Sequence, residues 1–177
     1  PLRAAELLAS TLSRLCGAEH VSRRLATTSF GGYNDAFADE RDGDSWLCSD
    51  PDVRKRYRAD PMCDFNFSVG AYRELFRLLA GISEKRGESW SARVPQSLPV
   101  LLIAGEDDPL GENGKGIHEV YERLSDAELC ELSMKLYPKG RHEILNDVMK
   151  HEVYADIIEW IHRVSDGVAA CRGAKLG

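Results

Sequence analysis

The chain has 177 residues, of which 43% are apolar and 29% are charged, with a net charge of −6. These proportions are those of a globular protein, and they exclude a disordered, fibrous or low-complexity chain. The longest apolar run, residues 98–104, is far shorter than the roughly 18 apolar residues of a membrane span, and the negative charge argues against nucleic acid or an anionic membrane as the main partner.

The charge is distributed unevenly along the chain. Residues 1–93 carry 14 basic and 14 acidic side chains, whereas residues 94–177 carry 9 and 15. This asymmetry predicts two regions of different character. The chain opens at Pro1 without a basic and apolar leader, and a segment that once preceded this start is expected to be missing.

The first half is predicted to be helical. Leu8, Leu12 and Leu15 recur at helical spacing up to Gly17, a residue typical of helix ends. A second amphipathic helix is expected to follow Ser68, which is its predicted N-cap. Between these helices, the proline-broken region 30–67 predicts short helical turns joined by loops, and no strand is expected before residue 97.

This middle region is rich in aromatic side chains. They either line an acyl-chain pocket or form a small local core, because both environments draw on the same residues. The aromatics in question are Tyr33, Phe37, Trp46, Phe65 and Phe67. The basic run 54–58 is flanked by aspartates and is expected to be a solvated helix face and not a nucleic-acid site.

The second half has the pattern of a parallel α/β structure. A strand buried on both faces is predicted over 97–104, a helix over 115–124, a second strand over 132–137, and a closing helix with an apolar stripe from Val153 to Val164. Alternating strands and helices predict parallel strands covered by helices. Two strands alone cannot form such a sheet, so its other strands are expected to lie outside this chain.

Two clusters of polar residues follow the two predicted strands. The sequence Gly105-Glu-Asp-Asp108 follows the first strand, and His142 follows the second after a tight turn. Because the carboxyl ends of parallel strands meet at one edge of a sheet, Asp108 and His142 are expected to lie together. An aspartate that orients a histidine, which acts as base toward a nucleophile, is the arrangement of acyl-transfer triads. The alternative is that Asp108 caps the next turn and His142 is a surface residue.

The sequence lacks the complete motifs that would indicate a metal site or a cofactor site. The three His-Glu pairs, at His118, His142 and His151, do not continue to the H-E-x-x-H zinc motif. The glycine-rich run 111–116 lacks the spacing of a phosphate-binding loop. The five cysteines form no C-x-x-C pair, which predicts reduced thiols in a cytoplasmic protein and neither a disulfide framework nor a zinc site. No metal or organic cofactor is implied.

Several stretches resemble one known family. Residues 98–116 (LPVLLIAGEDDPLGENGKG), 132–147 (LSMKLYPKGRHEILND) and 153–161 (VYADIIEWI) are similar to α/β-hydrolases of the lysophospholipase and monoacylglycerol-lipase type, the serine-aminopeptidase-like hydrolase domain. Residues 30–37 and 45–79 resemble the helical cap of such enzymes. The resemblance implies an α/β fold class: a partial α/β-hydrolase fold consisting of the last two parallel strands and their flanking helices, preceded by a helical cap.

The resemblance also implies a division of the chain and roles for its residues. Residues 1–93 would be the cap or lid region, and 94–177 the C-terminal part of the hydrolase core. In this family the triad order is serine, acid, histidine. The acid lies three residues after the glycine that ends its strand, which gives Asp108 as the acid, with Asp107 as the fallback, and His142 as the base.

The family's nucleophile is absent from the sequence. No G-x-S-x-G elbow occurs, and the nearest runs, around Ser83 and Ser89, lack the second glycine and a preceding strand. The serine is therefore expected in a missing N-terminal half or in a second chain. The complete form is expected to hydrolyse small lipid or acyl esters, and this chain alone is expected to be inactive. The alternative function is a non-catalytic interaction module built from half a hydrolase, which binds a partner through its sheet edge.

Overall fold

The computed structural model describes residues 2–30, 32–63, 65–82 and 90–173. Its residues fall into two compact units. The first comprises Pro1–Asp35 and Tyr57–Trp90, and the second comprises Ala36–Arg56 and Ser91–Gly177. The assignment of residues 1–93 to a cap and 94–177 to a core remains a prediction. The boundary between the two compact units differs from this division, because residues 36–56 belong to the second unit.

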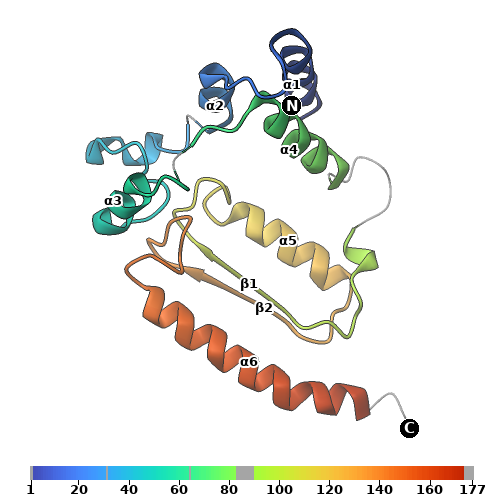
Figure 1. Ribbon diagram of the computed structural model, residues 1–177. Coiled ribbons are helices and arrows are strands. Elements are labelled where there is room, and N and C mark those ends of the chain that lie inside the picture. Colours follow the sequence, from blue (N-terminus) through green and yellow to red (C-terminus); the bar gives the residue numbers. More distant parts are fainter. Residues whose placement is uncertain (1, 31, 64, 83–89, 174–177) are drawn as a thin grey trace. The chain divides into compact units, whose positions relative to one another are not determined.

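The first unit is helical, as predicted. It contains α1 (Leu2–Cys16), α2 (Arg23–Phe30) and α4 (Val69–Ile82), shown in Figure 1. Their shared core consists of buried apolar side chains from all three helices, namely Ala9, Leu25, Val69, Tyr72 and Phe76. Burying these side chains is what holds the helices together, since isolated helices of this length are marginal in water.

Both helix ends predicted from the sequence are confirmed. Helix α1 ends at Cys16, directly before Gly17, whose φ of 89° is in the left-handed region that favours glycine. The Ser68 hydroxyl accepts a hydrogen bond from the Ala71 peptide N–H at 3.2 Å, which makes Ser68 the N-cap of α4. Among the described residues before Val100 there is no strand, as predicted. Val21 and Ser68 form an isolated antiparallel bridge there.

The region between these helices contains short helical elements, as expected. A 3₁₀ segment, η1 (Asp35–Glu40), is interrupted at Phe37, and α3 spans Pro51–Ala59. Asp50 precedes α3 and accepts the peptide N–H of Asp52 at 2.8 Å. Proline is well placed at the start of α3, because the first helical N–H has no partner within the helix.

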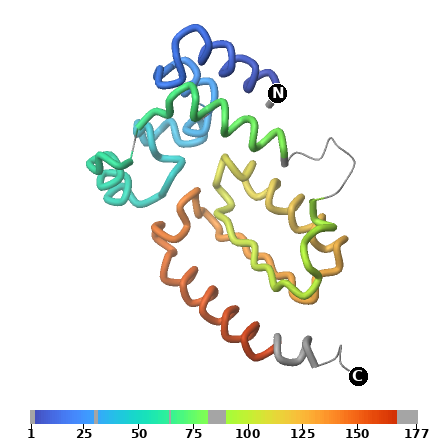
Figure 2. Tube along the Cα trace, turned by 45° about the vertical axis from the view of Figure 1, so that its right-hand side comes forward, coloured from blue at the N-terminus to red at the C-terminus, as the bar shows by residue number. Residues whose placement is uncertain are grey.

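The second unit is an α/β structure in the predicted order. After η2 (Ser91–Arg93) come β1 (Val100–Gly105), α5 (Lys115–Asp126), β2 (Leu132–Tyr137) and α6 (Lys150–Gly173). The two strands are parallel, and their register starts at Val100 opposite Leu132. Helices α5 and α6 lie on opposite faces of the strands (Figures 1 and 2). The core under α6 contains Tyr137, Ile144 and Val153.

The burial of β1 differs from the prediction. Residues Val100 to Ala104 are half-buried rather than buried on both faces. The reason is the size of the sheet: in the described part of the chain it has two strands, so β1 has a neighbouring strand along one edge. A continuous apolar strand with one neighbour fits the expectation that further strands come from outside this chain.

Two further expectations concern the membrane and the cysteines. Among the described helices, none is both long and apolar enough to cross a bilayer. Cys16, Cys48, Cys63 and Cys130 take part in no disulfide, while the side chain of Cys171 lies outside the described residues. Burial raises the pKa of the Cys48 thiol to about 11, so this thiol is a poor nucleophile at neutral pH.

Candidate active site

The loops that follow β1 and β2 are interlocked by two glycines. A Cβ atom on Gly105 would overlap the backbone carbonyl of Gly140, and one on Gly140 would lie 3.1 Å from the Gly105 Cα. This close approach allows the Asp107 peptide N–H to donate to the Gly140 carbonyl at 2.9 Å. The two loops therefore leave the strands side by side, and side chains a few residues further on can meet.

Asp108 is held by its own turn and faces His142. Its Oδ1 accepts the Leu110 peptide N–H at 2.9 Å, and its Oδ2 lies 3.0 Å from His142 Nδ1. The Asp108 side chain is 10% exposed, whereas Asp107 is exposed. Asp108 thus caps its turn with one oxygen and contacts His142 with the other.

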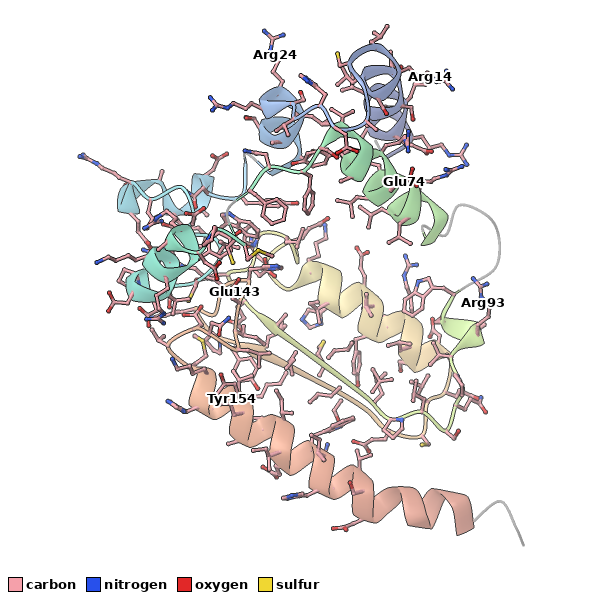
Figure 3. The ribbon with its side chains drawn as sticks, in the orientation of Figure 1. Arg14, Arg24, Glu74, Arg93, Glu143 and Tyr154 are labelled. Atoms are coloured by element: carbon pink, nitrogen blue, oxygen red, sulfur yellow. The ribbon has the colours of Figure 1, made fainter. Side chains whose placement is uncertain are left out.

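His142 is fixed by contacts on several sides. Its peptide N–H donates to the Trp46 carbonyl at 3.3 Å, and its ring lies 5.1 Å from the Trp46 ring, tilted by 37°. The side chain is 34% exposed, so the ring remains accessible. The hydrogen bond that His142 Nδ1–H donates to Asp108 raises the pKa of His142 above its ordinary 6.5, whereas burial lowers this pKa. The negative charge of Glu143, labelled in Figure 3 beyond the strand ends, acts in the same direction.

This geometry predicts the titration of His142. In an NMR pH titration of the chain, the midpoint for His142 is expected above 6.5, and Asp108→Asn is expected to lower it because the carboxylate that favours the imidazolium is gone. The charged pair stabilises the fold below the pKa of unfolded histidine, and this contribution is lost as the pH rises through the folded pKa. A midpoint unchanged by Asp108→Asn would contradict the contact.

The residue before His142 is buried in an ion cluster. Arg141 donates to the Ser45 carbonyl at 2.6 Å, pairs with Glu40, and lies 3.9 Å above the Phe37 ring. Its hydrogen bond lowers the pKa of Glu40. Buried guanidinium groups need such partners, since an unpaired buried charge is strongly destabilising.

A second arginine joins the same cluster and corrects one expectation. Arg54 pairs with Glu40 at 2.9 Å and with Asp42 at 3.0 Å, and it donates to the Cys48 carbonyl at 2.6 Å. It is therefore buried, and the prediction that the run 54–58 is a solvated helix face is wrong for this residue. Its ion-pair partners, Glu40 and Asp42, lie 12 or more positions before it in the sequence, outside the run and the aspartates that flank it.

A buried carboxylate joins the loop of His142 to residues 46–49. Asp147 is 0% exposed. It accepts the peptide N–H groups of Ser49, Arg141 and Val148 at 2.8 to 3.2 Å, and also the Ser49 hydroxyl. In addition, the Glu143 peptide N–H donates to the Leu47 carbonyl at 2.7 Å.

The aromatic residues singled out in the sequence are divided between the two units, and Tyr33 belongs to the first. Trp46 and Phe37 contact His142 and Arg141. Phe65 and Phe67 belong to the first unit, where they contact each other and, through Phe67, Tyr72. The single set of aromatics considered from the sequence, whether a pocket or a core, is therefore divided between two environments.

The sequence predicts that Asp108 and His142 lie together, but it does not indicate the residues that hold them in place. Asp108 and His142 each follow a strand, and the structure brings them together. Arg141 and Asp147 lie within residues 132–147, where no motif predicts a role for either of them, and the sequence marks Trp46 only as an aromatic residue. No spacing in the sequence links residues 46–49 with residues 141–148. Among the described residues, no group of three or more His, Cys, Asp or Glu is arranged to hold a metal ion.

Comparison with known proteins identifies a family model and several solved structures to which this chain is similar. A family model described as "Serine aminopeptidase, S33" matches residues 2–149. A thermostable carboxyl esterase from Bacillus coagulans, in complex with glycerol, is 25% identical over 92% of this chain and 52% of its own, with a TM-score of 0.80. A lipase in an open form matches at 23% identity over 89% and 50%, with a TM-score of 0.73.

A third structure is similar at a lower score. The monoacylglycerol lipase of Paleococcus ferrophilus is 22% identical over 90% of this chain and 51% of its own, with a TM-score of 0.59. The chain therefore spans about half the length of these three proteins.

Proposed function

Since the chain belongs to the serine aminopeptidase S33 family of α/β-hydrolases and has part of that fold, we propose that it supplies the acid and the base of a serine-type ester hydrolase. The family match confirms the resemblance noted in the sequence. The observation that carries the proposal is the 3.0 Å contact between Asp108 Oδ2 and His142 Nδ1 at the carboxyl ends of the two parallel strands. In open parallel sheets, functional groups gather at this edge.

The contact assigns a role to each residue. Asp108 accepts the Nδ1–H of His142, which leaves the Nε2 lone pair to act as the base. His142 takes the proton of the serine hydroxyl as that oxygen bonds to the acyl carbon, and then gives the proton to the departing alcohol. A water molecule repeats the sequence, releasing the acid and restoring the serine. Asp108 keeps its negative charge throughout and stabilises the imidazolium that forms.

The serine is proposed to come from a polypeptide segment outside these 177 residues. Among side chains near His142, the Ser49 hydroxyl donates to Asp147, and burial keeps the Cys48 thiol protonated. Neither arrangement suits a nucleophile. The segment belongs either to an N-terminal half of the same protein or to a second chain. We use the name complete hydrolase for this chain together with the segment that supplies the serine.

The proposed substrates are small lipid or related acyl esters. Support comes from the family and from the matched structures, which include a carboxyl esterase and a monoacylglycerol lipase. The rival function, a non-catalytic interaction module, is favoured by one observation: along its other edge, β1 has no neighbouring strand within the described residues. Open strand edges promote association with other polypeptides.

Labelling with a fluorophosphonate probe separates these functions. In the complete hydrolase we expect one serine to be labelled, outside residues 1–177 and within a G-x-S-x-G sequence, because a serine paired with a base reacts with such probes. His142→Gln is expected to abolish labelling, whereas His118→Gln, on the exposed surface of α5, leaves it unchanged. The isolated chain should show neither labelling nor ester turnover.

The other outcomes are equally informative. Ester turnover by this chain alone that is lost with His142→Gln would place the nucleophile within these residues. A complete hydrolase that is folded yet not labelled would support the interaction module instead.

A further inference from the structure

We propose that Asp147 is a positioning residue for His142, acting by clamping residues 46–49 against the histidine loop; this role in catalysis rests on the function proposed above. The Asp147 carboxylate accepts hydrogen bonds from peptide N–H groups and from the Ser49 hydroxyl. It acts on the two peptide segments that determine where the ring lies, one that carries His142 and one that carries Trp46.

The first part of the clamp is the carboxylate itself. Asp147 is completely buried, and both of its oxygens accept hydrogen bonds. On one side it accepts the peptide N–H of Arg141, directly before His142, at 3.1 Å. On the other side it accepts the peptide N–H of Ser49 at 3.1 and 3.2 Å, together with the Ser49 hydroxyl. A carboxylate buried with several N–H donors is well stabilised, and its removal leaves these donors unpaired.

The second part of the clamp runs from Ser49 to the histidine. Residues 46 and 47 accept hydrogen bonds from the next two peptide groups of the loop: the His142 N–H donates to the Trp46 carbonyl at 3.3 Å, and the Glu143 N–H donates to the Leu47 carbonyl at 2.7 Å. Together with the Asp147 contacts, these bonds join residues 46–49 to residues 141–143 along their whole length. The Trp46 ring is thereby placed 5.1 Å from the His142 ring.

The clamp determines the position of the imidazole between two neighbours. Asp108 holds Nδ1, and the Trp46 ring lies against the imidazole, so rotation of His142 away from Asp108 is limited by contacts with residues 46–49. General-base catalysis is sensitive to such placement, since a displacement of about 1 Å in an active site costs up to about 100-fold in rate. Residues 46–49 therefore help to hold the proposed base in place.

Asparagine is the substitution that tests the carboxylate. Asp147→Asn keeps the size of the side chain, but it replaces one acceptor oxygen with an NH2 group that faces N–H donors. Ser49→Ala is a milder second variant, which removes the hydroxyl bond and leaves the backbone bonds intact. Asp52→Asn is the matched control, because Asp52 is an exposed acid of the same segment.

NMR of the chain provides the first readout. With Asp147→Asn, we expect the His142 titration midpoint to move down toward that of an ordinary histidine, and the ring-current shift from Trp46 on the imidazole protons to decrease. The NMR chemical shifts of residues in β1 and β2 should not change. Ser49→Ala is expected to shift both signals in the same direction by less, and Asp52→Asn to shift neither. An unchanged His142 midpoint and ring-current shift in a folded Asp147→Asn chain, or in the Ser49→Ala chain if the former does not fold, would overturn the proposal.

Kinetics of the complete hydrolase provide the second readout. Asp147→Asn is expected to lower kcat about 10- to 100-fold while KM changes little, because the base and not the substrate site is disturbed. A loss confined to KM would contradict the positioning role. The NMR arm needs neither serine nor substrate. Failure of fluorophosphonate labelling would therefore reject the hydrolase function without affecting the clamp, and an unchanged NMR spectrum would reject the clamp without affecting the hydrolase function.

Discussion

Replacing Asp108 with asparagine is expected to lower kcat of the complete hydrolase about 10⁴-fold, the loss that follows when a triad aspartate becomes an amide. The amide places its NH2 or its weaker acceptor oxygen against His142 Nδ1, so it favours the wrong tautomer and cannot stabilise the imidazolium. Because Asp108 Oδ1 also accepts the Leu110 N–H at 2.9 Å, the turn can be kept by the amide oxygen. The measurement is kcat for a soluble chromogenic ester.

The neighbouring acid provides the matched control for this prediction. Asp107 is exposed, and Asp107→Asn removes the same charge one residue away. We expect kcat to change less than about 3-fold, as for a screened surface charge. If Asp107→Asn instead caused the larger loss, Asp107 would be the triad acid and the contact between Asp108 and His142 would have no catalytic role.

Replacing Gly105 with alanine is expected to destabilise the second unit by about 3 kcal/mol, the upper part of the usual range for overpacking. The added Cβ would overlap the backbone carbonyl of Gly140, and backbone cannot move aside as a flexible side chain can. The loops after β1 and β2 must then separate, which also pulls Asp108 away from His142. Urea unfolding followed by circular dichroism measures the loss of stability, and the His142 NMR titration reports the loss of the contact.

Another glycine of the same loop is the control. At Gly111 an added Cβ would meet its nearest atom, the Asp108 carbonyl oxygen, at 3.6 Å, which is ordinary van der Waals contact. Gly111→Ala is therefore expected to change the free energy of unfolding by less than about 1 kcal/mol, the scale of the unfolded-state entropy effect. Equal losses from both substitutions would show that the approach of Gly105 to Gly140 is not what the fold requires.

The parts of the fold that could be predicted are those encoded locally. The spacing of leucines and the residues Gly17 and Ser68 defined two helices and their ends, and the apolar runs defined both strands to within a few residues. The pairing of Asp108 with His142 was also accessible, because each residue directly follows a strand and parallel strands end at the same edge.

The supports of His142 were not accessible in this way. Asp147 bonds to Ser49 across 98 positions of sequence, and nothing in the local pattern of either segment indicates the other. The same holds for Arg54: the aspartates that flank the run 54–58 predict a solvated helix face, whereas its ion-pair partners, Glu40 and Asp42, lie 12 or more positions earlier in the sequence. The composition gives the number of charged residues, but only the tertiary packing determines which of them form buried ion pairs.

The way in which the chain is divided between the two units limits how this family member can be taken apart. The polypeptide passes from one unit to the other three times, near residues 35, 56 and 90. A truncation at residue 93 would therefore discard Trp46 and Ser49 along with the helices, and it would leave the histidine loop without its clamp. An exchange of the first unit between relatives, by recombination or by design, must instead be spliced at all three crossings so that residues 36–56 stay with the sheet.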